Sequence, residues 1–281
     1  MGHNLPFVKM HGAGNDFIMV ESRHLPAEGL TRAQIAAMCH RRHGIGADGL
    51  MVIQAPAVAG HDFAMTYYNG DGGKAEMCGN GARCAVAHAN RLGLVSSRCH
   101  FETGSGVLAG ELSPDGVTVS LPPWRDLRVG LSLAGSPFET HHFVDTGVPH
   151  LVIPVPDVAA VDLATWGPML RRHPDLGTAG ANVDWVETRP DPEGYPLRTY
   201  ERGVEAETLA CGTGAAAVAV VLCHLKLATS PVTLWTRGGD RLVVGGDLNT
   251  DRGTLWLKGP AVVTFSGEIE LSDLERDLKA G

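Results

Sequence analysis

Apolar and polar residues form many short runs along the chain, and two longer apolar stretches are set among them. The short runs are rich in Val, Ile, Leu and Phe, are bounded by Gly, Pro and Asp, and predict strands. The longer stretches, residues 79–91 and 212–226, are rich in Ala and Val and each predicts a helix. A helix that is apolar on all sides is normally buried, so we expect each one at the centre of its own half of the chain.

The remaining elements surround these two helices. A capping box of Thr31 and Gln34 predicts a helix that reaches about residue 41, and residues 163–172 predict another. The predicted strands cover residues 7–9, 17–20, 50–54, 63–68, 98–103, 107–113, 117–121, 141–145, 151–155, 182–187, 197–201, 232–236, 241–244, 254–258 and 261–265. We therefore expect an α+β protein of two domains. The consecutive prolines between Leu121 and Trp124 stiffen the chain and predict the boundary, giving domains 1–123 and 124–265.

Composition excludes several classes of protein. With 281 residues, 44% hydrophobic and 19% charged, the chain is typical of soluble globular proteins. A net charge of −8 argues against a nucleic-acid or anionic-membrane partner. The first residues lack the apolar core of a secretory signal, and the longest apolar run, residues 215–223, is too short to span a bilayer. Six cysteines are too few for a disulfide scaffold of this size, so we expect a cytoplasmic protein.

Two matching cysteine motifs carry the candidate chemistry. Cys78 and Cys211 are each followed by Gly-x-Gly and then by one of the two central helices. Each thiol therefore lies at a helix N-terminus, where unpaired N–H groups and the helix dipole favour negative charge. We expect a lowered pKa and partial thiolate character at both positions. The repetition indicates duplicated halves that each contribute one cysteine.

The cysteines and glycines also allow other interpretations. Free cysteine is usually a buried packing residue, and this is the interpretation for Cys39, Cys84, Cys99 and Cys223. A zinc site at Cys39-His-Arg-Arg-His43 lacks a second ligand cluster, and a thioredoxin-like site would need a CxxC motif. Gly44 to Gly49 spells a dinucleotide-binding pattern, but it follows a helix and precedes a strand, which indicates a turn.

Two thiols on opposite faces of one carbon can invert its configuration. One thiolate removes the proton, the opposite thiol returns another, and the roles exchange in the reverse direction. The N–H groups of the two helix ends would stabilise negative charge on a substrate carboxylate, and no metal or organic cofactor is required. Glu201 and Arg202 could bind a zwitterionic amino acid, or form a solvated charge pair. His150 is either a packing residue or a group that adjusts a nearby thiol.

The motifs together resemble the diaminopimelate epimerases, in order and over nearly the whole chain. They are M-H-G-A-G-N-D-F, E-M-C-G-N-G-A-R-C, P-H, N-V-D-W-V-E, Y-E-R-G and T-L-A-C-G-T-G. The resemblance implies cofactor-independent interconversion of LL- and meso-diaminopimelate in lysine and peptidoglycan-precursor synthesis. It also implies pseudo-symmetric domains with barrel-like sheets around the central helices, a C-terminal strand (266–281) returning to the first domain, and a homodimer.

The resemblance also assigns roles to individual residues. Cys78 and Cys211 would be the acid/base pair, and His150 and Glu201 would adjust the thiol pKa values. The residues expected to bind substrate are Asn15, Asn69, Gly79, Asn80, Asn182, Glu201, Arg202, Gly212 and Thr213.

Three positions depart from the family's pattern. Gly49 and Val148 stand where the family often has Gln and Asn, which leaves recognition of the distal end of the substrate open. Phe265 stands in the place of a tyrosine that family dimers use. A two-thiol racemase for another amino acid, such as histidine, is the first alternative. The others are a phenazine-type isomerase, which would replace the thiols with an acidic base, and a non-enzymatic thiol protein or metal binder.

Overall fold

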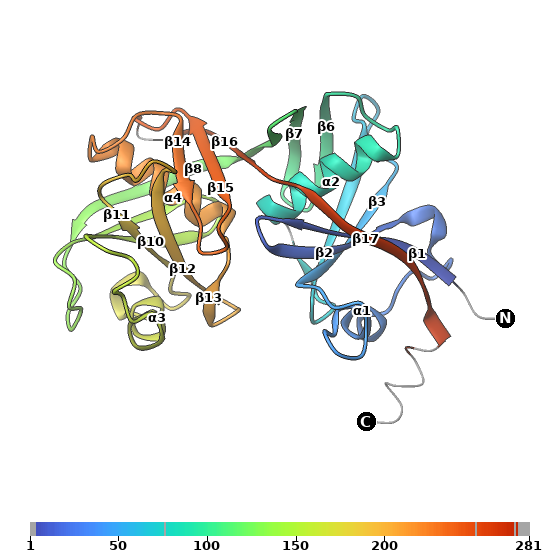
Figure 1. The fold of residues 1–281 in the computed structure, drawn as a ribbon, viewed down its shortest axis with the longest axis horizontal. Helices are drawn as coiled ribbons and strands as arrows, with labels where there is room; N and C mark the ends of the chain where they lie inside the picture. The colour runs from blue at the N-terminus through green and yellow to red at the C-terminus, as the bar shows by residue number, and fades with distance from the viewer. Residues whose placement is uncertain (1–3, 76, 251, 273, 275–281) are drawn as a thin grey trace. The chain divides into compact units, whose positions relative to one another are not determined.

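The chain forms two compact units, each combining a strand-rich sheet with one long buried helix (Figure 1). The computed structural model describes residues 4–75, 77–250, 252–272 and 274. The first unit contains the residues up to Val119 and those from Pro260 onward, and the second unit is Ser120–Gly259. The predicted fold class, α+β with two similar halves around central helices, is confirmed.

In the first unit the sheet surrounds the helix that follows Cys78. Its strands are β1 (Asn4–Gly12), β2 (Asn15–Glu21), β3 (Gly49–Gln54), β4 (Phe63–Asn69), β5 (Lys74–Ala75), β6 (Arg98–Thr103), β7 (Gly106–Ser113), the start of β8 (Gly116–Leu131) and β17 (Val262–Glu270). The hydrogen-bonded order is β17–β1–β2–β3–β4–β6–β7–β8, with β5 also on β4. The helix α2 (Gly79–Arg91) packs against β1, β2, β3, β4 and β7.

The helix α1 (Arg32–Cys39) and the short η1 (Ser22–His24) complete the first unit. The predicted capping box of α1 is present, with the Thr31 side chain and the Gln34 backbone N–H joined. The helix ends two residues before the predicted end, and the His40 imidazole then accepts from the N–H groups of Arg42 and His43.

In the second unit the strands close into a ring around its central helix. After β8 come β9 (His141–Asp145), β10 (Pro149–Val155), β11 (Asn182–Glu187), β12 (Tyr195–Glu201), β13 (Ala206–Thr208), β14 (Val232–Trp235), β15 (Arg241–Gly246) and β16 (Gly253–Gly259). The pairings run β8–β9–β10–β11–β12–β14–β15–β16, and β16 pairs back to β8. The helices are α3 (Leu163–Arg171), η2 (Pro174–Leu176) and the central α4 (Gly212–His224).

The division between the units differs from the predicted boundary at residue 123. It lies at Val119, and β8 continues without a break through Pro122 and Pro123. Proline cannot donate a ladder hydrogen bond, so it is tolerated in a strand only where no such bond is needed. The two prolines follow Val119, which pairs with β7, and precede Arg125, which pairs with β9.

The prediction that residues 261–265 belong to the C-terminal domain is also wrong. The strand predicted at residues 261–265 was assigned to the C-terminal domain, but it is the start of β17 and belongs to the first unit. It pairs with β1 in antiparallel register from Asn4↔Glu270 to His11↔Val262. Of the predicted returning strand 266–281, residues 273 and 275–281 lie outside the described residues.

The two central helices are buried in different ways. In α4 every residue from Gly214 to Cys223 is buried and uncharged, as the sequence predicts. In α2, however, the fully buried Arg83 donates to the Asn80 side chain at 3.0 Å and to the Pro260 carbonyl at 3.2 Å. A buried guanidinium needs such acceptors because burial removes its charged group from contact with water. No helix in the described ranges is long and apolar enough to cross a membrane.

Candidate functional site

A tight hairpin positions Asn15 beside the start of α2. The glycine-rich segment between β1 and β2 is a two-residue turn in which Ala13 and Gly14 have φ values of 57° and 84°. Two positive φ values in succession are typical of a type I′ turn. A Cβ on Gly12 would lie 2.7 Å from the Asn80 carbonyl oxygen, so only glycine lets the hairpin approach the helix this closely. Asn15 then begins β2 within reach of Cys78.

The Cys78 thiol contacts the Asn15 side chain. Cys78 is half-buried and has an extended backbone at the N-cap of α2. Its Sγ donates to Asn15 Oδ1 at 3.4 Å, and Asn80 Nδ2 donates to the same oxygen at 3.3 Å. The structure thus brings three of the predicted site residues into one hydrogen-bonded group.

An acidic residue fixes which end of the Asn15 amide faces the thiol. Asn15 Nδ2 donates to Asp48 at 2.7 Å, which leaves Oδ1 directed at Cys78. Arg41 in turn binds Asp48 at 2.7 Å and both oxygens of Asp16 at 2.9 and 2.8 Å. Burial raises the pKa of Asp16, but the hydrogen bonds and charges of Arg41 and Lys9 outweigh burial and hold that pKa well below its usual range. The charged cluster therefore anchors the Asn15 end of the site.

Asn69 and Gly49 lie together at one end of the paired strands β3 and β4. They are opposite each other in the β3–β4 register, and the Asn69 side chain is exposed. A Cβ on Gly49 would lie 2.4 Å from the Tyr68 carbonyl oxygen and 2.6 Å from the Tyr67 ring. The backbone therefore leaves no room for a side chain at position 49.

The Cys211 thiol lies at the corresponding place in the second unit. It is the N-cap of α4, and its Sγ accepts from the Gly214 N–H at 3.4 Å. The Thr213 hydroxyl is also 3.4 Å from the sulfur. The predicted thiolate character of Cys211 is wrong for this structure. Burial, followed by the Glu201 and Asp184 carboxylates, raises the pKa of the Cys211 thiol well above its ordinary value. These effects exceed the lowering of the pKa by hydrogen bonds from the Thr213 hydroxyl and the Gly214 N–H.

His150 and Asn182 lie next to Thr213 on neighbouring parallel strands. They face each other in the β10–β11 register, and both are buried. His150 Nε2 is 3.0 Å from the Thr213 hydroxyl and 3.3 Å from Asn182 Nδ2. The Arg202 backbone N–H donates to Asn182 Oδ1 at 2.8 Å, so the segment after β12 holds this amide. The second unit thus gathers the predicted residues around the start of α4.

Asp184 and Thr199 belong to the same cluster, and neither was among the predicted site residues. Asp184 Oδ2 is 2.7 Å from His150 Nδ1, and the Thr199 hydroxyl donates to Asp184 Oδ1 at 2.6 Å. Both residues are buried, and they oppose each other in the β11–β12 register. The sequence held one signal: Asp184 is a charged residue inside the apolar strand N-V-D-W-V-E, two positions from Asn182 and so on the same face.

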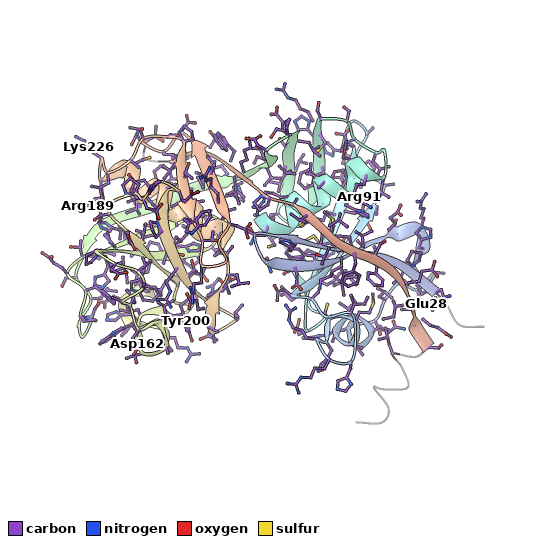
Figure 2. The ribbon with its side chains drawn as sticks, viewed as in Figure 1. Glu28, Arg91, Asp162, Arg189, Tyr200 and Lys226 are labelled. Atoms are coloured by element: carbon purple, nitrogen blue, oxygen red, sulfur yellow. The ribbon has the colours of Figure 1, made fainter. Side chains whose placement is uncertain are left out.

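The turn after Glu201 is anchored to α3. The Tyr200 hydroxyl, labelled in Figure 2, donates to the Glu205 carbonyl at 2.7 Å. The Glu205 carboxylate accepts from Arg171 and Arg172 at 2.8 Å each. Arg202 itself has no acidic partner among the described residues. The structure therefore fixes the backbone of this turn, while the Arg202 guanidinium is available to an anion.

The other four cysteines are packing residues, as the sequence indicates. All four are buried, and burial raises the pKa of Cys39 and Cys84 to about 12 and that of Cys99 to about 11. The pKa of Cys223 is raised by burial as well. Within the described ranges, no group of His, Cys, Asp and Glu side chains is arranged to hold a metal ion.

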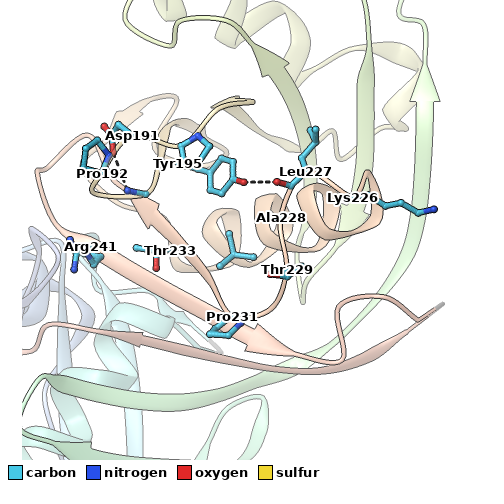
Figure 3. Close-up of a pocket in the computed structure, with 13 residues that line it drawn as sticks. Asp191, Pro192, Tyr195, Lys226, Leu227, Ala228, Thr229, Pro231, Thr233 and Arg241 are labelled. Carbon is cyan, nitrogen blue, oxygen red and sulfur yellow. Dashed lines mark hydrogen bonds between the residues drawn. The ribbon is translucent and has the colours of Figure 1, made fainter.

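A pocket of about 510 Å³ lies in the second unit (Figure 3). Tyr195 crosses it, and its hydroxyl donates to the Leu227 carbonyl at 2.5 Å. Asp191, Lys226 and Arg241 are among its lining residues. None of the predicted site residues lines this pocket, so size alone does not identify the functional site.

Solved structures share this fold at low sequence identity. A phenazine biosynthesis protein of the PhzF family from Bacillus anthracis superposes with a TM-score of 0.73 at 14% identity, covering 95% of this chain and 99% of that one. A hydroxyproline epimerase from Agrobacterium vitis gives a TM-score of 0.71 at 14% identity, covering 96% and 94%. These likenesses show the two-unit fold.

Closer relatives share the sequence over its whole length. The diaminopimelate epimerase of Gemmatimonas aurantiaca is 41% identical over 280 residues, which cover 94% of this chain and 99% of that protein. That of Aquifex aeolicus is 37% identical over 283 residues, covering 96% and 100%. The family model described as diaminopimelate epimerase matches residues 7–122 and 142–263, one segment around each cysteine motif. With two cysteines at equivalent helix starts and this full-length similarity, the chain belongs to the diaminopimelate epimerase family.

Proposed function

We propose that the protein is an isomerase that interconverts LL- and meso-diaminopimelate without a metal or organic cofactor. Its reaction would serve lysine and peptidoglycan-precursor synthesis. The observation that carries the proposal is the repeated placement of a thiol, Cys78 in one unit and Cys211 in the other, at the N-cap of a buried helix. The names of its full-length relatives supply the substrate.

In the proposed mechanism the two cysteines exchange protons with the same α-carbon. One thiolate removes the α-proton, and the other thiol delivers a proton to the opposite face. Cys78 donates a hydrogen bond to Asn15, and burial keeps Cys211 protonated at rest. Formation of a thiolate therefore needs a change at the site, such as loss of water or arrival of the substrate ammonium group.

The helix starts would bind the reacting carboxylate. The α2 ladder begins at Ala82 N–H to the Cys78 carbonyl, and the α4 ladder at Ala215 N–H to the Cys211 carbonyl. The first-turn N–H groups before them lie outside these ladders, where the positive helix ends favour an anion. The proposed carboxylate site consists of Gly79, Asn80, Gly212 and Thr213.

The rest of the predicted set would bind the remainder of the substrate. Arg202 has no acidic partner among the described residues, so it suits a carboxylate, and Glu201 beside it suits an ammonium group. Glu201 also raises the pKa of Cys211, and His150 reaches that thiol through Thr213. The remaining proposed contacts are Asn15, Asn69 and Asn182.

Gly49 favours a second candidate function, a racemase for another amino acid. The backbone around Gly49 has no space for the glutamine side chain common in the family. The distal end of the substrate must therefore be bound differently here, or the substrate is another amino acid. A panel that includes histidine separates the two candidates.

We also propose a cytoplasmic homodimer. All six cysteines are free, which suits a reducing compartment. In the described part of the chain β1 is the strand paired with β17, and Phe265 and Val262 on β17 are 46% and 43% exposed. A second copy that covers this strand would bury these side chains. Light scattering of the native protein and of Phe265→Glu tests the dimer: monomers in both would contradict it.

The decisive experiment incubates LL-diaminopimelate with reduced enzyme in D₂O. We expect α-deuterium in the product together with the meso isomer. Cys78→Ala and Cys211→Ala should each lower the rate by about 1,000-fold or more, since each removes an acid/base group. Cys84→Ala is the matched control because Cys84 lies in α2, the helix that Cys78 caps, but is fully buried. It should stay within about threefold of the native rate.

Two outcomes would overturn the proposal. Native protein that folds but exchanges no α-proton of diaminopimelate excludes the substrate, and the amino-acid panel then identifies another. If exchange persists in Cys78→Ala and Cys211→Ala at the rate of Cys84→Ala, the thiols are not the acid/base pair.

A further inference from the structure

A continuous chain of hydrogen-bonding groups leads from Cys211 into the interior of the second unit. The Thr213 hydroxyl is 3.4 Å from Cys211 Sγ and 3.0 Å from His150 Nε2. His150 Nδ1 is 2.7 Å from Asp184 Oδ2. The His150 and Asp184 side chains are both 0% exposed, so water does not compete for these contacts.

The neighbours of His150 determine which of its nitrogens carries the proton. Asn182 accepts from the Arg202 N–H through Oδ1, so its Nδ2 must face His150 Nε2. Nε2 is therefore an acceptor, and the proton lies on Nδ1, from which it is donated to Asp184. The Thr213 hydroxyl then donates to Nε2 and accepts from the Cys211 thiol. Every donor in the chain meets an acceptor.

Three neighbours, His150, Thr199 and Gly214, fix the position of the Asp184 carboxylate. Besides His150, it accepts from the Thr199 hydroxyl at 2.6 Å. Its Oδ1 also occupies the space that a Cβ on Gly214 would need, at 2.3 Å. A buried carboxylate is costly unless it has hydrogen-bonding partners, and His150 and Thr199 supply them here.

We propose that Thr213, His150 and Asp184 form a proton relay for Cys211. The Cys211 S–H proton moves to the Thr213 oxygen as the Thr213 hydroxyl proton moves to His150 Nε2. The products are a thiolate and an imidazolium, and the imidazolium Nδ1–H remains bonded to Asp184. The reverse transfer restores the thiol. Asp184 does not reach the sulfur and acts as a positioning residue.

The relay explains how a thiolate can form at Cys211 although the thiol is buried. The sulfur sits near two carboxylates in a desolvated place, which opposes a thiolate. Because the proton stays nearby on His150, the thiolate forms beside a new positive charge and the net charge of the cluster does not change. The Gly214 N–H, 3.4 Å from the sulfur, then donates to the thiolate. This inference rests on the proposed acid/base role of Cys211.

The first test compares the effect of removing the Thr213 hydroxyl with the effect of removing the Thr208 hydroxyl, which is not part of the relay. Thr213→Val keeps the backbone N–H groups and the shape but lacks the hydroxyl, whereas Thr213→Ser retains it. Thr208→Val is the control because the buried Thr208 hydroxyl has no hydrogen-bond partner among the described residues. We expect kcat for diaminopimelate to fall by about 100-fold in Thr213→Val with KM changed by less than about threefold. Thr213→Ser should stay within about fivefold of native kcat, and Thr208→Val within about twofold.

A second test does not depend on turnover. In protein labelled with ¹⁵N-histidine, the His150 signals, assigned by His150→Gln, should show a proton on Nδ1 and none on Nε2. Asp184→Ala should lose this fixed tautomer, while Asp184→Asn, whose Oδ1 can still accept, should keep it but lower kcat by about tenfold. In a Cys78→Ser background, methanethiosulfonate should modify Cys211 more slowly in Thr213→Val than in Thr213→Ser.

The relay and the proposed function fail in different ways. If the native enzyme epimerises diaminopimelate but Thr213→Val is as active as Thr208→Val, the relay is excluded and the function stands. A proton on His150 Nε2 in the native protein also excludes it. If the native enzyme does not act on diaminopimelate, the tautomer and the Cys211 reaction rate still decide the relay.

Discussion

A Cβ atom on Gly214 would lie 2.3 Å from Oδ1 of Asp184. The second glycine of the C-G-T-G motif is therefore tied to a carboxylate on another strand. Glycine is unfavourable within a helix by roughly 1 kcal/mol relative to alanine, and its use here is explained by this close approach.

The pair makes a testable prediction for stability. Gly214→Ala should lower the free energy of unfolding by about 1–3 kcal/mol because the added methyl group displaces a packed carboxylate. In an Asp184→Ala background the same change should be neutral or stabilising, since the space is then open and alanine favours the helix. Urea unfolding of the four proteins gives the coupling energy. Equal costs in both backgrounds would show that the two residues do not compete for this space.

The thiols should differ sharply in reactivity. At neutral pH iodoacetamide should modify Cys78 first, because it is half-buried whereas the other five are buried. The pKa values of Cys39 and Cys84 are raised to about 12 by burial, so these two should react only after unfolding. Peptide mass mapping of native and urea-treated protein measures the order. Early labelling of Cys84 in native protein would contradict the packing of α2.

Acid should destabilise the protein through His142. Burial, and then the charges of His141 and His224, lower the pKa of His142 to about 4 from an ordinary value of 6.5. Its Nδ1 accepts from the Gly130 N–H, which requires the neutral ring. Between pH 6.5 and 4 the unfolded chain binds a proton that the folded chain does not, so stability falls as the pH falls through this range.

A variant isolates this contribution. His142→Asn can still accept from Gly130 through its Oδ1 but does not titrate. The native protein should lose on the order of 2 kcal/mol more than His142→Asn between pH 7 and pH 4.5, after allowance for solvent screening. Urea unfolding at both pH values measures the difference. Parallel losses in the two proteins would show that His142 is not the titrating group.

Restoring the family's glutamine at position 49 should fail. Gly49→Gln places a Cβ 2.4 Å from the Tyr68 carbonyl oxygen, so the backbone at one of these positions must move to make room for the side chain. We expect a loss of about 1–3 kcal/mol in the free energy of unfolding. Val148→Asn, at the other departure, is the matched control. Val148 is half-buried in a loop, so that change should cost less than about 0.5 kcal/mol. Thermal unfolding measures the stability of both variants. Equal stability of Gly49→Gln and Val148→Asn would contradict this prediction.

The sequence predicted local features well where one residue type leaves few choices. Thr31 and Gln34 made a capping box because the side chain of each accepts from the backbone N–H of the other. Cys78 and Cys211 preceded their helices as the Gly-x-Gly motifs indicated. Strand β9 was predicted with its observed bounds, His141–Asp145.

Features that depend on distant parts of the chain were missed. The paired prolines indicated a break, but β8 changes its pairing partners there and continues. The raised pKa of Cys211 depends on burial and then on Glu201 and Asp184, which only the folded chain brings near the thiol. Asp184 was visible as a charge in an apolar strand, yet its partner His150 is 34 positions away in the sequence.

The pairing of β17 with β1 has a consequence for biosynthesis. Strand β1 lies between β2 and β17, so the sheet of the first unit combines residues that precede the second unit in the sequence with residues that follow it. The second unit is made of one contiguous stretch, Ser120–Gly259. β17 follows every residue of the second unit in the sequence, so on the ribosome it is translated after them. The part of the chain that is translated first is therefore completed last.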